Sequence, residues 1–207
     1  MNNINILKFF FPFVLLGCAP NVLEEKKVIQ KINSLDMNVF SKTGEKIYSI
    51  TSPDSKYDKI KLVFNLKRTT INLFKGKDIK YIVDADSSRL LDKNNIVELN
   101  GNVKLRTLNQ NNDYLYGDSL TWNINESKYE LFGNVRFENR NVFLYSNKAI
   151  LRKDNIIEFL NPLKYIVKDN NNEEKYQINS ENAFYNIDKE SLSFRAKDKK
   201  VRSIIYF

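Results

Sequence analysis

Residue types that commonly perform catalysis are scarce in this 207-residue sequence. There is no histidine and one cysteine, Cys18, which excludes a histidine general base, a histidine-containing triad and a cysteine–histidine zinc site. Gly-rich phosphate loops and the G-x-S-x-G nucleophile motif are absent as well. Asp84, Asp86, Asp92 and Asp118 could form a carboxylate pair, but turn residues at strand ends are the simpler interpretation. The sequence therefore favours a protein that is not an enzyme, with no metal site and no cofactor.

Cys18 follows the apolar run Phe9–Leu16. The run is shorter than the ~20 residues that a helix needs to cross a bilayer, and Lys8 is the one charged side chain before it, as is typical of a secretory signal. The ending Leu15-Leu16-Gly17-Cys18 resembles the bacterial lipobox, in which a signal peptidase cuts before a cysteine that carries a diacylglyceryl group. We therefore expect a signal peptide over residues 1–17 and a lipid anchor on Cys18. The alternative is a free or buried thiol behind an N-terminal anchor helix.

A unit of two alternating segments is written twice between Ile96 and Lys153. The first segment of each copy is centred on Gly-Asn-Val, at Gly101 and at Gly133, and the spacing is 133 − 101 = 32 residues. The second segment opens with Gly117-Asp118-Ser119-Leu120 in one copy and with Ser146-Asn147-Lys148-Ala149 in the other. A weaker third copy covers 158–165 and 179–186. Such a repeat predicts stacked antiparallel rungs, and a glycine within a strand permits the bend that each rung needs.

Alternating apolar and polar residues assign two faces to each segment, as in Val103–Arg106. Further strands are expected at Lys46–Ser52, 59–66, 70–74 and 79–86, and a polar loop at 168–174. We predict that the apolar faces of the repeated strands line the interior, through Val103, Leu105, Leu120, Trp122, Leu131, Val135, Phe137, Phe143, Tyr145, Ala149 and Leu151. The 11 Tyr and 14 Phe would fill a closed core or border an open groove between two sheet layers, and the sequence does not decide between these.

Composition supports one β-domain over 37–207, after a tether at 18–36 that could be a short amphipathic helix or a solvated linker. The 42% of hydrophobic residues is enough for a single core. The net charge of +8 is spread along the strands, which is typical of a solvated outer face. In an exported protein, any phosphates that it attracts would belong to lipids rather than to nucleic acid. The apolar strand 201–207 invites pairing with a second sheet.

The repeated pattern E-L-x-G-N-V-x-L, followed by Y-x-G-D-x-L-x-W, resembles the OstA-like β-jellyroll family of lipopolysaccharide export. It covers Ile96–Asn123, Tyr129–Arg152 and, loosely, Ile157–Asn186. The length, the single jellyroll and the N-terminal anchor resemble the LptC group of this family more than the soluble LptA group. The resemblance implies an all-β, antiparallel, twisted β-jellyroll with an open V-shaped groove for lipid acyl chains. One departure is the lipobox, because LptC proteins usually hold to the inner membrane by an uncleaved transmembrane helix.

The resemblance also implies partners. The protein would receive lipopolysaccharide from an inner-membrane ABC transporter with LptF- and LptG-like periplasmic domains. It would pass the lipid to an LptA-like bridge jellyroll or to the jellyroll of the outer-membrane translocon. The C-terminal docking edge would comprise Ser203, Ile204, Ile205, Tyr206 and Phe207, and the N-terminal docking edge Lys46–Ser52.

Two questions stay open at this point. The anchor would place the domain on the periplasmic side of the inner membrane, with the inner leaflet of the outer membrane as the alternative, because Ala19 follows Cys18 where many retained lipoproteins have aspartate. The alternative function is an adaptor lipoprotein that scaffolds an outer-membrane assembly complex and carries no lipid.

Overall fold

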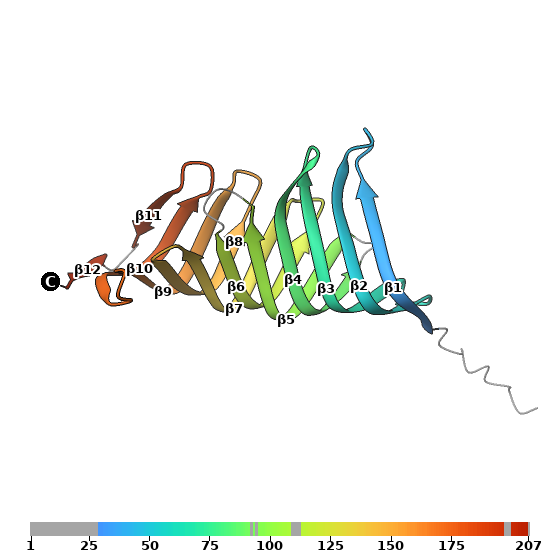
Figure 1. The fold of residues 1–207 in the computed structure, drawn as a ribbon, viewed down its shortest axis with the longest axis horizontal. Coiled ribbons are helices and arrows are strands. Elements are labelled where there is room, and N and C mark those ends of the chain that lie inside the picture. Colours follow the sequence, from blue (N-terminus) through green and yellow to red (C-terminus); the bar gives the residue numbers. More distant parts are fainter. Residues whose placement is uncertain (1–28, 92, 94, 109–112, 197–199, 207) are drawn as a thin grey trace, which may run out of the picture.

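Long antiparallel strands make up most of the chain (Figure 1). The computed structural model describes residues 29–91, 93, 95–108, 113–196 and 200–206. Its strands are β1 (Ile29–Phe40), β2 (Lys46–Asp58), β3 (Val63–Lys75), β4 (Asp78–Leu91), β5 (Ile96–Thr107), β6 (Tyr114–Asn123), β7 (Lys128–Asn139), β8 (Val142–Leu151), β9 (Ile156–Lys168), β10 (Glu174–Asn186), β11 (Ser191–Arg195) and β12 (Arg202–Ile205). None of the described segments is a helix that could span a membrane.

The strands follow one another through a single twelve-stranded sheet. β1 to β11 are hydrogen-bonded in chain order, and β12 pairs with β10 beside β11. β11 covers residues 182–186 of β10 and β12 covers residues 176–179. β1 therefore forms one edge of the sheet and β11 with β12 the other, at opposite ends of the ribbon in Figure 1. The prediction of an all-β antiparallel jellyroll is confirmed.

The central strands bend near their middles, where the pairing register shifts. On β5 the shift lies between Asn100 and Val103, and on β7 between Phe132 and Val135. The two residues between them, a Gly-Asn pair each time, have φ of 78° and 46° on β5 and of 72° and 47° on β7. This left-handed backbone suits glycine and asparagine better than other residues. We call the line of bends the corner of the roll.

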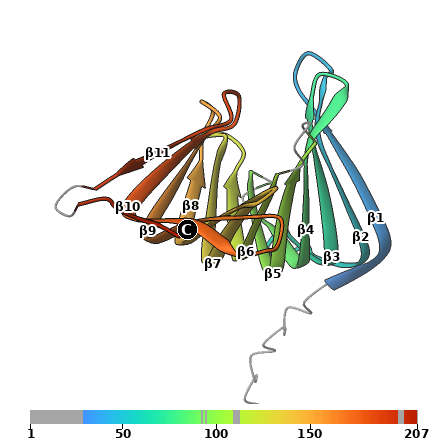
Figure 2. The ribbon, with the colours of Figure 1, turned by 60° about the vertical axis from the view of Figure 1, so that its left-hand side comes forward.

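The halves of each strand on either side of the corner lie in two facing layers, and Figure 2 shows the sheet folding over on itself. The first layer holds residues 46–51 of β2, 78–84 of β4 and 135–139 of β7, and the second layer holds 119–123 of β6 and 182–186 of β10. Aromatic pairs join the layers, with ring centroids 4.9 Å apart for Tyr48 and Trp122, and 4.7 Å apart for Phe137 and Tyr185. We call the side opposite the corner, where the turns of the two layers meet, the mouth.

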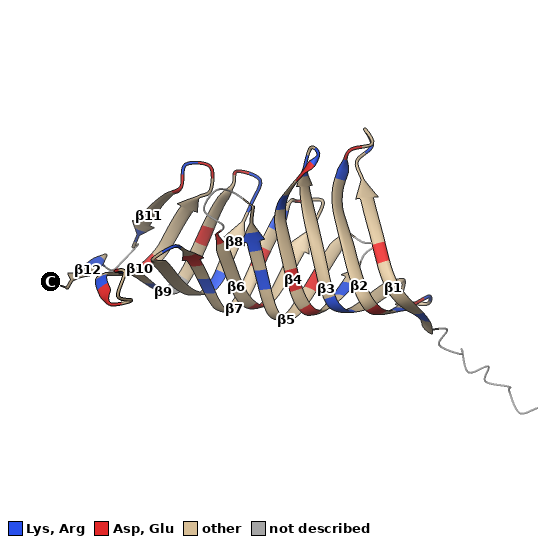
Figure 3. Cartoon of the chain, in the orientation of Figure 1, with Lys and Arg blue, Asp and Glu red and all other residues tan. Residues whose placement is uncertain are grey.

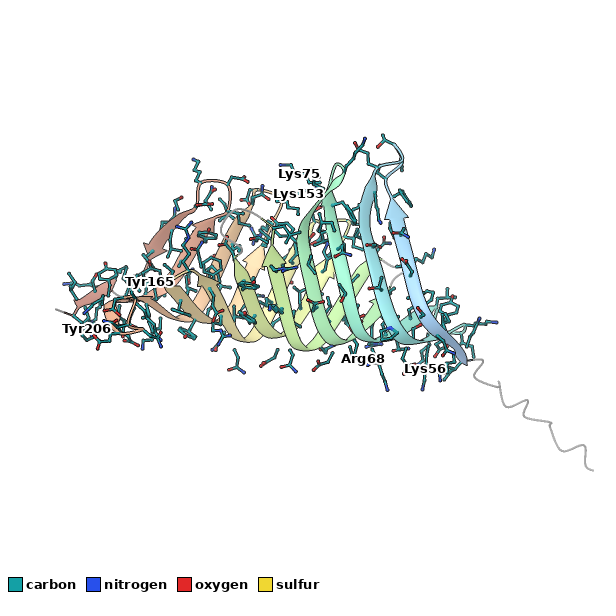
Figure 4. The ribbon with its side chains drawn as sticks, in the orientation of Figure 1. Lys56, Arg68, Lys75, Lys153, Tyr165 and Tyr206 are labelled. Carbon is teal, nitrogen blue, oxygen red and sulfur yellow. The ribbon has the colours of Figure 1, made fainter. Side chains whose placement is uncertain are left out.

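Figure 4 shows the corner and the mouth on opposite sides of the ribbon. Arg68, at the corner of β3, lies on the lower side, and Lys75 and Lys153, next to or within turns at the mouth, lie on the upper side. Figure 3 shows Lys and Arg mixed with Asp and Glu over the strands. The outer face thus carries both signs of charge, as expected for a solvated surface.

Two boundary predictions were wrong. The strand β1 begins at Ile29, so residues 29–36 belong to the sheet and not to a tether; their mixed polar and apolar residues gave little alternation to detect. The strand β2 continues through Pro53 to Asp58. Proline is tolerated there because it falls at the corner, where the Ser52 hydroxyl donates a hydrogen bond to the Lys67 carbonyl at 2.7 Å.

Candidate functional site

The interior between the two layers is the candidate site, and most of the residues predicted for it lie there. Their exposed fractions run from 1% for Val135 to 6% for Leu151. They pack in one core with Tyr48, Leu144 and Phe159. The predicted residues found in this core are Val103, Leu105, Leu120, Trp122, Leu131, Val135, Phe137, Ala149 and Leu151.

Phe143 and Tyr145 were assigned to the wrong face. Tyr145 is 38% exposed, and Lys168 places its ammonium group 5.2 Å from the Phe143 ring centre. The inward-facing residues of β8 are Leu144 and Ser146 before the corner, and Ala149 and Leu151 after it. They therefore change from even-numbered to odd-numbered positions at the corner, where the pairing register with β9 shifts. Strict alternation cannot reveal this extra residue, since no glycine marks it.

Where the structure describes both layers, the interior between them is tightly packed. A cavity of about 10 Å³ remains among Tyr81, Leu115, Phe137, Leu151 and Tyr185, which is at the lower limit for one water molecule. Between the layers formed by the described residues, the open V-shaped groove implied by the family resemblance is therefore not found. An acyl chain could occupy the interior only if the layers moved apart or side chains repacked.

A buried polar contact joins the layers near one end of the core. The Tyr185 hydroxyl on β10 donates a hydrogen bond to Oδ2 of Asp113 at 3.2 Å, across 72 residues of sequence. Asn139 Nδ2 donates to the other Asp113 oxygen at 2.5 Å. Burial raises the pKa of Tyr185, and the Asp113 carboxylate raises it further. Asp113 is thus held from both layers by hydrogen bonds that keep them together.

A second polar contact closes the mouth. Lys80 Nζ in the first layer donates to Oδ1 of Asn155 at 3.1 Å, and Asn155 Nδ2 donates to Oδ2 of Asp188 at 2.9 Å. Asn155 lies in the turn between β8 and β9 and Asp188 in the turn between β10 and β11. Both contacts were missed from the sequence, because the groups that meet are far apart along the chain and belong to no motif.

Two of the four aspartates considered as a carboxylate pair lie elsewhere than predicted, and Asp92 lies outside the described residues. Asp86 and Asp118 lie within β4 and β6 at the corner, not at strand ends. Each accepts a hydrogen bond from an asparagine side chain at 2.8 Å, from Asn102 to Asp86 and from Asn134 to Asp118. They therefore stabilise bends. Among the described residues, no cluster of Cys, Asp and Glu is arranged to hold a metal ion.

The two edges of the sheet are the places where another sheet could pair. The C-terminal edge matches the predicted segment in part: β12 is exposed along its whole length, with exposed fractions of 43% for Ile204 and 58% for Ile205. In Figure 4, Tyr206 marks this end of the molecule. The N-terminal edge was predicted wrongly, because Lys46–Ser52 pairs with β1 on one side and β3 on the other. β1 is the edge strand instead. Phe207 and Cys18 lie outside the described residues.

Comparison with known proteins agrees with this architecture. A sequence model of the family described as "Lipopolysaccharide-assembly, LptC-related" matches residues 18–142, which is more than half of the chain and includes β1 to β7. None of the curated proteins matches the sequence. The chain therefore belongs to the LptC-related family of lipopolysaccharide-assembly proteins, whose role is lipopolysaccharide transport in outer-membrane biogenesis.

Proposed function

We propose that this protein receives lipopolysaccharide from an inner-membrane ABC transporter and passes it, through the space between its two layers, to the next jellyroll of a periplasmic bridge. The observation that carries the proposal is the continuous apolar interior, which extends from Tyr48 on β2 to Tyr185 on β10. It runs between two sheet edges, at β1 and at β11 with β12. A conduit needs this arrangement, with an apolar path and a docking edge at each end.

The hydrophobic effect supplies a reason for such a path. Each methylene group transferred from water to an apolar interior gains about 0.8 kcal/mol, so an acyl chain of about 12 carbons gains on the order of 10 kcal/mol. That gain is available to offset separation of Phe137 from Tyr185 and of Tyr48 from Trp122, the aromatic pairs that join the layers. The packed interior is then the empty state, and lipid replaces contacts that the layers make with each other.

Docking by strand addition fits both edges. An edge strand offers unpaired backbone N–H and C=O groups to a partner sheet. On β12 these groups are accompanied by exposed Ile204 and Ile205, and at the ends of β1 by Ile29 and Phe40, which are 51% and 57% exposed. β12 would pair with an LptA-like jellyroll or with the jellyroll of the outer-membrane translocon. β1 would pair with the LptF- or LptG-like periplasmic domain of the transporter.

The proposed position in the cell envelope is supported by the family and by the lipobox. The LptC family indicates the periplasmic side of the inner membrane, and a diacylglyceryl group on Cys18 would supply the anchor. Mass spectrometry of the membrane-extracted protein tests this, since a mature chain beginning at acylated Cys18 supports it and an intact N-terminus contradicts it. Separation of inner and outer membranes then shows which bilayer holds the protein.

The experiment that tests the conduit compares tryptophan on the two faces of neighbouring strands. Val135 lies on the inner face of β7. Tyr145 lies on the outer face of β8, where it pairs with Arg136 of β7. Val135→Trp fills interior space and should reduce the lipopolysaccharide that co-purifies with the full-length protein several-fold, whereas Tyr145→Trp should not change it. Ala149→Val is the milder inner variant if Val135→Trp fails to fold. Equal lipid retention by the folded inner and outer variants would contradict the proposal.

One observation favours the second candidate, an adaptor that scaffolds an outer-membrane assembly complex without carrying lipid. The interior of the described structure leaves about 10 Å³ of empty space, as a purely structural core would. Co-purification separates the two functions. ABC-transporter subunits bound to the full-length protein support the conduit, and outer-membrane assembly proteins without lipopolysaccharide support the scaffold.

A further inference from the structure

Lys80 occupies an irregular position at the mouth. Leu73 on β3 pairs with Tyr81 on β4, whereas the next residue of β3, Phe74, pairs with Ile79. Lys80 is therefore the extra residue of a β-bulge, a feature that re-aims a side chain and is common beside functional sites. Its ammonium group lies 5.0 Å from the Tyr81 ring centre and contacts Asn155 in the opposite layer. The bulge thus aims a cation at the mouth.

A cavity of about 240 Å³ lies beside Lys80. It is lined by Lys75, Asp78, Ile79, Lys80, Tyr81, Thr107, Leu108 and Ile187. Tyr81, Thr107 and Ile187 also border the small cavity inside the core, so they separate the mouth from the interior. Leu108 is 41% exposed although it is apolar. The cavity therefore combines apolar walls with two lysines and one aspartate, and it leads toward the core.

The hydroxyl of Tyr81 is unusual at this boundary. The residue is 7% exposed, and in the part of the chain that the structure describes its hydroxyl has no hydrogen-bond partner. Buried polar groups normally have one, and each exception calls for an explanation. A polar group of a bound molecule at the mouth would provide the missing partner.

We propose that this mouth cavity is the entrance for a phosphorylated lipid. Lys75 and Lys80 bind the phosphate, the Tyr81 hydroxyl donates a hydrogen bond to it, and Ile79, Leu108 and Ile187 receive the acyl chain. Lysine binds phosphate as a compact point charge, and a lipid phosphate that contacts Lys80 replaces Asn155 as its partner. The hydrogen bond between Lys80 and Asn155, which joins the two layers, is then released at the place where the acyl chain must pass. This inference rests on the proposed conduit and deepens it, since it assigns the point of entrance and the group that controls it.

Equilibrium binding of labelled lipopolysaccharide to the full-length protein tests the phosphate contact. Lys80→Gln should weaken binding about five-fold, the effect of one partly exposed charge pair worth about 1 kcal/mol. It should leave the binding of dephosphorylated lipopolysaccharide unchanged. Lys104→Gln is the matched control, because Lys104 lies on the outer face of β5 over the ring of Tyr114 and should have no effect on either probe. Competition with phosphatidylglycerol vesicles shows whether phospholipid phosphates share the site.

A reversible link across the mouth tests the opening. In a Cys18→Ala background, Lys80→Cys and Asn155→Cys joined by a short bis-methanethiosulfonate linker should abolish lipopolysaccharide uptake, and reduction of the linker should restore uptake to the level of the same variant before linking. Uptake by the linked protein at the unlinked rate, or equal effects of Lys80→Gln and Lys104→Gln, would overturn the assignment of the entrance. If the unmodified protein bound no lipopolysaccharide at all, the proposed conduit itself would fail, so the two failures are distinguishable.

Discussion

Asn134 on β7 donates a hydrogen bond from Nδ2 to Oδ2 of Asp118 on β6 at 2.8 Å. The same bond, at the same length, joins Asn102 on β5 to Asp86 on β4. In each case the asparagine follows a glycine with positive φ. The repeat seen in the sequence is therefore a repeated corner, in which an aspartate on one strand fixes the left-handed Gly-Asn pair of the next.

Gly133→Ala should destabilise the fold by about 2–4 kcal/mol. A Cβ at this position would lie 2.3 Å from Oδ2 of Asp118, and its φ of 72° adds the cost of a left-handed backbone, about 1–2 kcal/mol for a residue with a Cβ. Chemical denaturation measures the free energy of unfolding. Gly44→Ala is the control, because φ there is also positive but a Cβ meets nothing within 4 Å; equal losses for the two variants would contradict the close-contact explanation.

Gly117 and Leu131 should show energetic coupling. A Cβ on Gly117 would lie 2.7 Å from Cγ of Leu131, and φ at Gly117 is not positive, so the clash alone makes Gly117→Ala unfavourable, by about 1–3 kcal/mol. Leu131→Ala removes the clashing atoms at the cost of a cavity. In a double-mutant cycle the combined variant should be less destabilised than the sum of the two single variants. Strict additivity would show that the clash is relieved in another way.

Alkaline pH should destabilise the fold through its buried tyrosines. Burial, with a smaller contribution from Asp188, raises the pKa of Tyr81 to about 12, so the folded state holds this proton more tightly than the unfolded chain, whose tyrosines titrate near 10. The stability from this group is fully present below pH 10 and is lost as the pH rises from 10 through 12, amounting to about 2–3 kcal/mol. Tyr81→Phe should flatten the pH dependence of unfolding over this range. An unchanged slope in that variant would exclude Tyr81 as a source.

Ile205→Lys should prevent docking at the C-terminal edge without unfolding the protein. Ile205 lies on the exposed edge strand β12, and a lysine on an edge opposes pairing with another sheet. The thermal midpoint should change little, as for most exposed positions, while recovery of the bridge jellyroll in pull-down assays should fall strongly. Ile60→Lys places the same charge at another exposed isoleucine, in the turn between β2 and β3, and should leave docking intact. Loss of docking in both variants would point to a general effect of charge.

Sequence reasoning found the parts of the fold that repeat. Gly101 and Gly133 mark the bends, and the alternation around them assigned Val103, Leu131, Val135 and Phe137 to the interior. It failed on β8, where the change of face carries no glycine. It failed on the first half of β1 as well, because polar and apolar residues do not alternate clearly over residues 29–34.

The contacts at the mouth were beyond sequence reasoning for a different reason. Lys80 and Asn155 are 75 residues apart, and they meet only because the sheet twists and folds over at the corner. A bulge that re-aims one lysine leaves no periodic signal either. Local patterns report the strand, whereas these contacts depend on how the whole sheet closes.

The most direct test of the conduit is a scan along one strand. A photoreactive residue is placed at one position of β7 at a time. The inner positions are Leu131, Val135 and Phe137, which face the core, and the outer positions are Phe132, Arg136 and Glu138. Cross-linking to lipopolysaccharide is then measured in cells that are exporting it. The conduit predicts strong capture from the three inner positions and little from the three outer ones. Equal capture from both faces, or capture from none of the inner positions in folded protein, would contradict it.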